Sequence, residues 1–286
     1  MGHWPIESAS DKVAYMRFSY LSTFDDHTNH GIQFSILTVL YKSGKYRASL
    51  LESLREHTEN YEYLEHSNDL QNLGYAKATN KLIRESKGKY IILLNPDSRV
   101  TDGWADDLRK TAESDQKIGI VVPKLLRLNN VIDSTGHDYS KWPYAIGNRG
   151  EGELDHGQYD NAIELVSSSF GCALIKRALV EKIGLLDERF FLYYEDVEYC
   201  HRARKSGWRV AYCPTSVVYH ERHGSGHSKW IAESRRYLPY ILRKYYPKRV
   251  LVSWYLWKVK ATFAGLRNRD LVYASSNFRA MVDGVW

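Results

Sequence analysis

The sequence predicts an α/β fold in which a mostly parallel sheet is flanked by helices and followed by a C-terminal helical extension. Two runs of strand length, Phe34–Tyr41 and Tyr90–Leu94, are almost wholly apolar, which is typical of strands buried on both faces of a sheet. A segment with helical spacing follows the first run, and strand–turn–helix units predict parallel strands. The 286 residues suffice for one large domain of this class or two small ones.

The other elements follow in order along the chain. Helices are expected where apolar residues recur at helical spacing or a capping residue begins a run: 46–57, 75–86, 102–112, 177–183 and 197–206. Further strands are expected in the short apolar runs 117–124, 162–166, 172–176, 208–212 and 215–220, with Pro214 splitting the last two. The Gly- and Tyr-rich segment 129–161 has little periodicity and is expected to cover or line a site. The chain thus divides into an irregular segment 1–33, an α/β domain 34–228 and a helical extension 229–286.

Cysteine usage and hydropathy favour a cytoplasmic protein. Cys172, Cys200 and Cys213 form no Cys-x-x-Cys pair and leave one over if two bond, which favours a reducing compartment. No run reaches about 18 uninterrupted apolar residues, so no membrane span is expected. The N-terminus has neither a basic start nor an apolar core, so no secretory signal is expected either.

The basic character of the chain, which has a net charge of +6, belongs to the extension. Residues 229–286 carry 12 Lys/Arg and 3 Asp/Glu, whereas the preceding residues carry 28 and 31. Basic residues interleaved with Trp and Tyr are typical of a segment on an anionic membrane surface, here the inner face, and also suit a lipid-linked acceptor. A helix packed against the α/β domain with a solvated basic face is the alternative. Nucleic-acid binding is not expected, because no recognised module accompanies the charge.

The most informative stretch is the end of the strand Tyr90–Leu94. Pro96 cannot donate to a sheet ladder, so the strand must end there and Asp97 follows at its carboxyl end. Open α/β sheets bind their ligands at that edge, and a carboxylate there suits a hard divalent metal that bridges phosphate oxygens. Alternatively Asn95–Ser98 is only a turn, since these residue types are typical of turns.

A second acidic site, Glu195-Asp196, precedes the expected helix 197–206, whose dipole stabilises a carboxylate. His220 ends a late strand and offers a neutral nitrogen ligand. A metal on Asp97 and His220, with a diphosphate completing its shell, leaves a carboxylate free to accept a proton. Such a set suits transfer from a nucleotide-sugar, because the metal offsets charge on the departing diphosphate and a general base deprotonates the attacking hydroxyl.

Each of these residues also has a simpler interpretation. Glu195-Asp196 could only cap the helix, and His220 could be a hydrogen-bonded histidine at a strand end. His220, His223 and His227 could form a zinc cluster, although the stretch lacks a cysteine or a clear fourth ligand. The stretch Asn72–Asn80 matches neither of the known glycine fingerprints for phosphate.

In their order along the chain, these segments resemble the family-2 glycosyltransferases of the GT-A fold, a Rossmann-related fold, and particularly the rhamnosyltransferase-like branch. The resemblance spans roughly residues 34–227. It is carried by the segments Ser35–Tyr41, Asn72–Asn80, Ile91–Asp97, Gly171–Lys176, Ile183–Arg202 and Val217–His220. The combination of Asn-Pro-Asp with Glu-Asp, in this order, is specific.

The resemblance implies a function and a role for each matching residue. Members of this family are inverting enzymes that act without a covalent intermediate. A hexosyl or deoxyhexosyl group such as rhamnosyl would pass from a nucleoside-diphosphate sugar to a hydroxyl of a glycan or lipid-linked glycan. Asp97 and His220 would hold Mn²⁺ or Mg²⁺, and Asp196 would be the catalytic base with Glu195 beside it. The residues implied for the nucleotide-sugar pocket are Thr38, Leu40, Tyr41, Asn72, Gly74, Asn80 and Asn95.

One departure separates the chain from the family pattern. The family has a second strand of the type Val-Val-Asp-Asn-Gly-Ser, whose aspartate contacts the nucleotide base. Only residues 55–71 fill that interval here, and no such strand is expected; Glu65 or Asp69 of a degenerate remnant would take the role. This motivates a rival interpretation, a catalytically weak or inactive relative that binds sugar-nucleotide or glycan. A nucleotidyltransferase, with Lys42–Lys45 as its loop, is the other rival.

Overall fold

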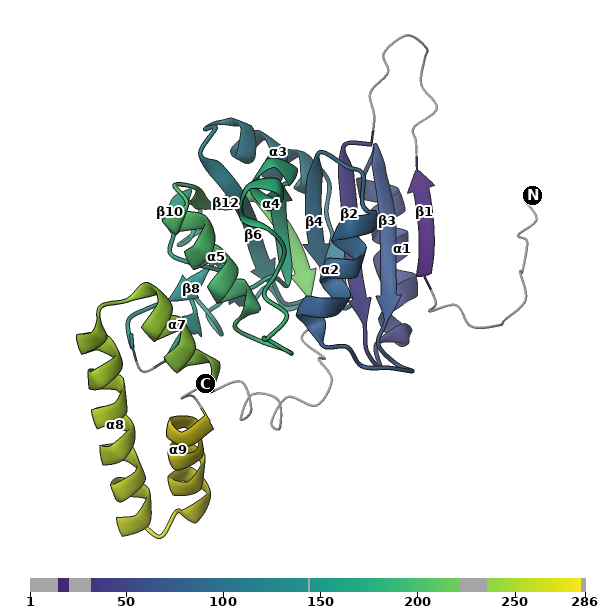
Figure 1. Ribbon diagram of the computed structural model, residues 1–286. Coiled ribbons are helices and arrows are strands. Elements are labelled where there is room, and N and C mark those ends of the chain that lie inside the picture. The colour runs from purple at the N-terminus through teal and green to yellow at the C-terminus, as the bar shows by residue number, and fades with distance from the viewer. Residues whose placement is uncertain (1–14, 21–31, 144, 222–235, 284–286) are drawn as a thin grey trace, which may run out of the picture.

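The computed structural model describes residues 15–20, 32–143, 145–221 and 236–283 (Figure 1). The strands are β1 (Tyr15–Tyr20), β2 (Phe34–Leu40), β3 (Tyr61–Ser67), β4 (Tyr90–Leu94), β5 (Ser98–Val100), β6 (Ile118–Leu126), β7 (Ile132–Ser134), β8 (His137–Asp138), β9 (Gly147–Asn148), β10 (Ile163–Leu165), β11 (Cys172–Lys176) and β12 (Arg209–His220). The helices are α1 (Gly44–His57), α2 (Tyr75–Glu85), α3 (Trp104–Glu113), α4 (Arg177–Ile183), α5 (Glu195–Lys205), α7 (Tyr237–Tyr245), α8 (Lys248–Arg267) and α9 (Leu271–Asp283).

The strands form one large mixed sheet in the order β1-β3-β2-β4-β11-β6-β12-β10, which confirms the α/β class. β3, β2 and β4 are mutually parallel, and β6 is parallel to β12. β11 runs antiparallel between β4 and β6, so these five parallel strands all point the same way. Their carboxyl ends therefore share one edge of the sheet.

Helices cover both faces of this sheet (Figure 1). α1 and α3 pack on one face, where Leu50, Leu54 and Trp104 join a buried cluster with apolar residues of β2 and β4. α2, α4 and α5 pack on the other face, where Leu82 and Tyr199 belong to a second cluster. Both faces of the central strands are thus covered, which explains why β2 and β4 read as continuous apolar runs.

The predicted C-terminal helical extension is present. α7 packs against the segment before α5, where the rings of Phe190 and Tyr237 lie 4.8 Å apart. α8 and α9 contact each other along their length, and this hairpin projects away from the sheet (Figure 1).

Three features differ from the sequence-based expectations. β3 occupies the interval 55–71, in which no strand was expected. The expectation that the second strand of the family pattern is missing is therefore wrong. Its apolar pattern is interrupted by buried polar residues that are paired: Glu62 accepts a hydrogen bond from Ser35 at 2.7 Å. β1 lies within the segment expected to be irregular and pairs with β3. β12 is one strand with an irregularity between Cys213 and Val217, which accommodates Pro214 without ending the strand.

Candidate active site

The end of β4 sets the position of the first acidic residue. All five residues of β4 are buried, and the backbone N–H of Ser98 donates to the Asn95 carbonyl at 3.3 Å, which closes a turn through Pro96. The turn interpretation is therefore right, yet it does not exclude a ligand role. The Asp97 side chain is buried, and its Oδ1 lies 3.2 Å from Nε2 of His220.

His220 lies between two carboxylates. It ends β12 directly beside the Asp97 turn, because β12 pairs with β5 at His220 and Ser98. Its Nε2 also lies 3.2 Å from Nδ2 of Asn95, and its Nδ1 lies 2.9 Å from Oδ2 of Asp133. Burial would lower the pKa of His220, but the hydrogen bonds to Asp133 and Asp97 outweigh it and raise that pKa to about 9.

Asp133 was not among the sequence-based candidates. It lies on β7, in the aperiodic segment expected to cover or line a site, and its side chain is only 5% exposed. A lone aspartate without a neighbouring motif gives no sequence signal, so only the pairing of β7 with β6 reveals its position.

The acid pair Glu195-Asp196 opens helix α5, where the helix dipole favours negative charge. Burial raises the pKa of Asp196 to about 6, although backbone hydrogen bonds from Val197 and Phe170 act in the opposite direction. Burial and the charge of Asp196 together raise the pKa of Glu195 well above its usual range. Among the residues that the structure describes, none hydrogen-bonds Oε2 of Glu195. A carboxylate that titrates near neutral pH is suited to general-base work.

The turn Phe170-Gly171 joins the two acidic sites. The Gly171 carbonyl accepts the backbone N–H of Asn95 at 2.9 Å, and the Phe170 backbone bonds to the Asp196 carboxylate. Tyr75, at the start of α2, donates its hydroxyl to the Phe170 carbonyl at 3.3 Å. The end of β4, the start of α5 and the start of α2 therefore meet at this turn.

The predicted nucleotide-sugar residues on β2 also lie at this edge of the sheet. The Thr38 hydroxyl donates to the Leu94 carbonyl at 3.0 Å, and the Leu40 carbonyl accepts the backbone N–H of Asn68 at 2.7 Å. Tyr41 follows β2 and is partly exposed. Thr38 thus ties β2 to β4, while Leu40 and Tyr41 reach the carboxyl edge.

The stretch before α2 places Gly74 against Phe191, in the segment that leads to the acid pair. Gly74 has φ +80°, and a Cβ built on it would lie 2.5 Å from the Phe191 carbonyl oxygen, so only glycine fits. The Asn72 side chain accepts the Gly74 N–H at 3.0 Å and shapes this entry. The Asn80 amide bonds to the backbone of Leu186 in both directions, at 2.9 and 3.0 Å. Asn80 therefore anchors the segment that leads to the acid pair.

Asp69 and Glu65 lie at the end of β3 in different environments. Glu65 is buried, and its two carboxylate oxygens share the N–H of Arg47 Nε, at 2.9 and 2.8 Å. Asp69 is exposed beyond the strand, and its Oδ1 accepts the backbone N–H of Lys42 at 2.6 Å.

The donors near Asp97 fit a hard divalent cation that shares its shell with a diphosphate. Asp97 offers carboxylate oxygens and His220 an imidazole nitrogen, and such oxygen and nitrogen donors suit Mn²⁺ or Mg²⁺. No group of three His, Cys, Asp or Glu side chains within the described ranges is arranged to hold a metal unaided. Phosphate oxygens would have to complete the coordination. His223 and His227 of the zinc alternative lie outside the described residues.

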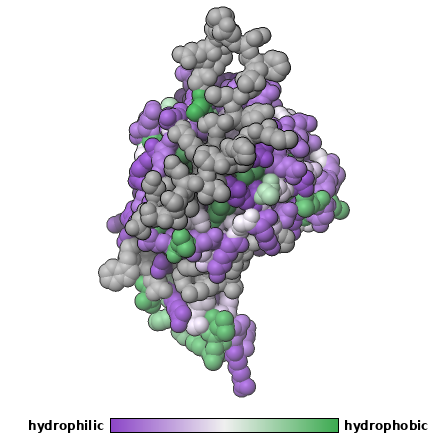
Figure 2. Space-filling model, turned by 90° about the vertical axis from the view of Figure 1, so that its right-hand side faces the viewer, coloured by the Kyte–Doolittle hydropathy of each residue, from purple (hydrophilic) through white to green (hydrophobic). Residues whose placement is uncertain are grey.

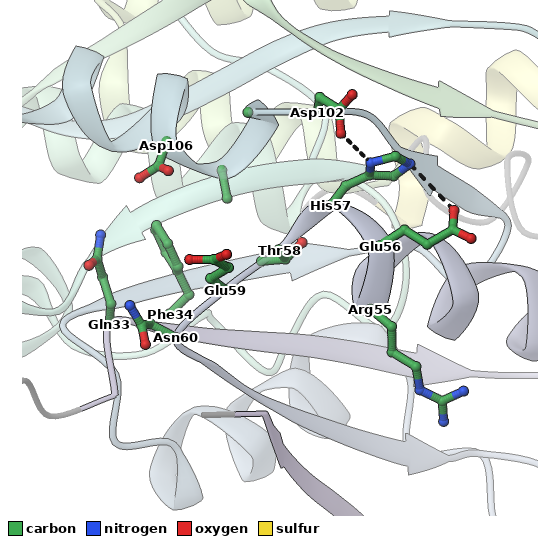
Figure 3. Close-up of a pocket in the computed structure, with 12 residues that line it drawn as sticks. Gln33, Phe34, Arg55, Glu56, His57, Thr58, Glu59, Asn60, Asp102 and Asp106 are labelled. Carbon is green, nitrogen blue, oxygen red and sulfur yellow. Dashed lines mark hydrogen bonds and ion pairs between the residues drawn. The ribbon is translucent and has the colours of Figure 1, made fainter. Parts of the chain in front are cut away.

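A pocket of about 450 Å³ lies elsewhere, at the start of β2 and the end of α1 (Figure 3). His57 points toward Asp102 there, with Nδ1 and Oδ1 2.5 Å apart. The start of β2 is the opposite edge of the sheet from Asp97, so this pocket is separate from the candidate site.

Comparisons with known proteins bear on the family and the fold. A hexosyltransferase of low-salt glycan biosynthesis from Haloferax volcanii is 27% identical over 155 residues, which are 53% of this chain and 47% of that protein. The N-acetylglucosaminyl-diphospho-decaprenol L-rhamnosyltransferase of Mycobacterium tuberculosis is 27% identical over 183 residues, 54% of this chain and 58% of that protein. The aligned part is thus about half the length of these curated relatives.

Solved structures share the fold at low identity. GalNAc-T7 with UDP, GalNAc and Mn²⁺ superposes with a TM-score of 0.58 at 14% identity, over 86% of this chain and 52% of that chain. The mannosyltransferase PcManGT of Pyrobaculum calidifontis, with GDP-Man and Mn²⁺, gives 0.51 at 12% identity, over 90% and 88%. The family model described as "Glycosyltransferase like family 2" matches residues 31–237, which include all of the expected α/β domain 34–228. The chain therefore belongs to the family-2-like glycosyltransferases.

Proposed function

We propose that this protein is an inverting glycosyltransferase that moves a hexosyl or deoxyhexosyl group, such as rhamnosyl, from a nucleoside-diphosphate sugar to a hydroxyl of a glycan or lipid-linked glycan. The observation that carries the proposal is the turn Phe170-Gly171, because it bonds both to the strand end before Asp97 and to the Asp196 carboxylate. A diphosphate held near Asp97 would leave the sugar within reach of the acid pair. The named activities of the relatives support the same substrate class.

In this proposal Asp196 accepts the proton of the acceptor hydroxyl while that oxygen attacks the anomeric carbon. The bond between the anomeric carbon and the diphosphate oxygen breaks on the opposite side, and the diphosphate leaves with the electron pair. A single displacement of this kind inverts the anomeric centre and needs one base. The raised pKa of Asp196 suits that base, since a stronger base accepts the proton more readily.

Asp97 and His220 would hold Mn²⁺ or Mg²⁺, and the cation would neutralise charge on the departing diphosphate. Asn95, whose amide lies beside His220, would border the same position. Asp69 is the better candidate for the nucleotide base, because Glu65 is already bonded to Arg47 within the fold. Thr38, Leu40, Tyr41, Asn72, Gly74 and Asn80 would shape the donor side.

The rival of an inactive relative loses its motivation, because β3 fills the interval in which a strand was thought to be missing. The loop proposed for a nucleotidyltransferase is occupied: the Lys42 backbone bonds to Asp69, and the Lys42 and Lys45 side chains lie over neighbouring tyrosine rings. Neither the presence of β3 nor the contacts of Lys42 and Lys45 favour a second function.

The test is transfer from a panel of nucleoside-diphosphate sugars to lipid-linked and free glycan acceptors, with Mn²⁺, Mg²⁺ or a chelator. We expect transfer with inversion from at least one donor, and its loss with the chelator. Asp196→Asn should reduce transfer by about 10²–10⁴-fold while it leaves metal-dependent donor binding intact. An Asp196→Asn variant with wild-type turnover would exclude the base assignment, and a protein that binds no donor would exclude the function.

The same proposal includes an anionic membrane as partner. Five apolar side chains of α8 recur at intervals of four and three residues and are 40–67% exposed: Val252, Leu256, Val259, Phe263 and Leu266. We call them the apolar stripe. They lie opposite the face that packs on α9, where Trp254 and Gly265 are buried. Hydrophobic side chains gather at the lower end of the molecule in Figure 2, where Figure 1 places this hairpin.

Charge favours a bilayer over a second copy of the chain as the partner of the apolar stripe. Arg249, Lys260 and Arg267 lie along one border of the stripe and are exposed. Pairing two copies would bring these cations together, and residues 236–283 include only two acids, Asp270 and Asp283. Anionic headgroups would instead complement them, on the inner face of the membrane where a lipid-linked acceptor would lie. Among the helices described, none is long and apolar enough to cross a bilayer.

A further inference from the structure

We propose that Asp133 is a positioning residue for His220 and sets how tightly the protein binds its divalent cation. This inference rests on the proposed function, because it assigns His220 to the metal. It concerns the carboxylate on the far side of the imidazole ring, which no sequence motif marks.

The contact has the geometry of an orienting hydrogen bond. Oδ2 of Asp133 lies 2.9 Å from Nδ1 of His220, and the side chains are 5% and 12% exposed. With both groups shielded from water, the carboxylate requires a proton on Nδ1. The other nitrogen, Nε2, faces Asp97 at 3.2 Å and is the one left to bind a cation.

The Asp133 carboxylate is itself fixed from several directions. β7 pairs with β6 on one side, and the Ile132 N–H donates to the Glu153 carbonyl at 2.7 Å on the other. Nε of Arg127 lies 3.5 Å from the second carboxylate oxygen of Asp133. Because the Asp133 backbone is held by these pairings and its carboxylate lies beside the Arg127 guanidinium, the carboxylate can orient the His220 imidazole on a different strand.

β6 connects the two residues. β12 runs along one side of β6, where Tyr219 is opposite Leu126, and β7 runs along the other, where Ile132 is opposite the same residue. Asp133 and His220 each adjoin one of these partners, on strands of opposite direction, and their hydrogen bond of 2.9 Å joins the two strands near the end of β6. The segment 129–161 thereby supplies a residue that contacts a proposed metal ligand.

The test measures cation binding directly. Mn²⁺ is titrated by electron paramagnetic resonance in the presence of whichever of UDP, GDP or dTDP binds the wild-type protein best. We expect Asp133→Ala to weaken Mn²⁺ binding by about 10–100-fold. Asp133→Asn keeps the side-chain volume but lacks the charge that fixes the proton on Nδ1, so we expect a smaller loss. Because Asp133→Asn is nearly isosteric, it keeps the test decisive if Asp133→Ala does not fold.

A matched control exists at the opposite edge of the sheet. Asp102 also contacts a histidine, His57, but it is 93% exposed and lines the pocket at the start of β2. Asp102→Asn should bind Mn²⁺ like the wild type. In Mg²⁺-bound protein labelled with ¹⁵N-histidine, the His220 ring should carry its proton on Nδ1, and Asp133→Ala should lose that signature.

The outcomes separate the two proposals. If the wild type binds no Mn²⁺ with any of the three nucleotides, the proposed metal-dependent function fails. If the wild type binds Mn²⁺ and both Asp133 variants bind it equally well, the metal site stands and the role of Asp133 is refuted.

Discussion

The buried carboxylate of Glu198 accepts a hydrogen bond from Nζ of Lys244 at 2.7 Å, which joins the helix that begins with the acid pair to the C-terminal extension. Tyr245 donates to the same oxygen at 2.6 Å, and Arg202 pairs with the other oxygen at 3.1 Å. α7 is therefore packed on the α/β domain, as one sequence-based alternative expected, whereas α8 presents the exposed apolar stripe.

Lys244→Met should destabilise the protein and reduce transfer together. Glu198 is fully buried, so the loss of one cationic partner leaves its charge undercompensated, at a cost of about 1–3 kcal/mol. Because Glu198 lies two residues after Asp196, we also expect lower kcat. The measurements are thermal unfolding and initial rates. Arg243→Met removes the same charge from an exposed neighbour and should change neither, so equal effects of the two variants would contradict the role of the pair.

Gly74→Ala should destabilise the protein more than Gly103→Ala. Both glycines have positive φ, +80° and +71°, so both variants incur backbone strain of about 1–3 kcal/mol. Only at Gly74 would the new Cβ meet another atom, the Phe191 carbonyl oxygen, whereas nothing lies within 4 Å at Gly103. Denaturant unfolding gives the two free energies of unfolding. Donor affinity should fall only in Gly74→Ala; equal losses of stability would show that the close approach carries no energy.

Transfer should decrease below about pH 6. As the proposed base, Asp196 must be unprotonated to accept a proton, and burial raises its pKa to about 6. We expect kcat/KM to fall about tenfold per pH unit below that value, and Asp196→Asn to reduce kcat by about 10²–10⁴-fold at neutral pH. A pH–rate profile from pH 4.5 to 8 measures both. A profile flat down to pH 4.5 would show that a different group limits the acid side.

Glu195→Gln should stabilise the protein at high pH. The pKa of Glu195 is raised on folding, so its favourable contribution is complete at low pH and is lost as the pH rises through the folded-state pKa. The amide avoids burying a charge beside Asp196, and we expect a gain of about 0.5–2 kcal/mol at pH 8 and none at pH 4. Thermal unfolding at both pH values tests this. A gain of the same size at both would indicate a packing effect instead.

Leu256→Glu should weaken binding to anionic vesicles. Leu256 is 60% exposed in the apolar stripe, and its insertion into a bilayer would be worth about tenfold or more in affinity. Leu154→Glu changes a leucine that is 64% exposed in another part of the chain and serves as the matched control.

Removing the charges of Lys260 and Arg267 should weaken binding to anionic vesicles by about 2 kcal/mol, or about 30-fold. Sedimentation with phosphatidylglycerol and phosphatidylcholine vesicles separates charge from insertion, and a dimer disrupted by Leu256→Glu would favour a second copy.

Much of the fold is visible in the sequence where local pattern and tertiary burial agree. β4 is a continuous apolar run closed by Pro96, so its burial and its end follow from composition. β3 was not predicted, because the buried polar residues Glu62, Glu65 and His66 interrupt its apolar pattern. The burial of Glu62 and Glu65 is stabilised by hydrogen bonds from Ser35 and Arg47. These partners are too distant along the chain to be recognised from the sequence pattern of β3 itself.

The candidate site divides along the same line. Asp97 and His220 stand at the ends of strands with buried apolar residues, and Asp196 stands in the first turn of helix α5; such positions are a sequence signal. Asp133 has no such signal, because its meaning arises only when β7 and β12 flank β6. Sequence therefore predicts the candidate groups at element ends, whereas the group proposed to orient His220 is found only from the tertiary pairing.

Tyr193 and Tyr194, which precede the acid pair, both adopt left-handed backbone conformations, with φ of 68° and 70°. Two adjacent bulky residues in this region are held there only by the surrounding structure. Burial also disfavours the charged forms of Glu195 and Asp196 and raises the pKa of each. All four residues, 193–196, are therefore held in locally unfavourable states. A laboratory selection for heat resistance alone should therefore accumulate substitutions at 193–196, and the survivors should be robust proteins that have lost their turnover.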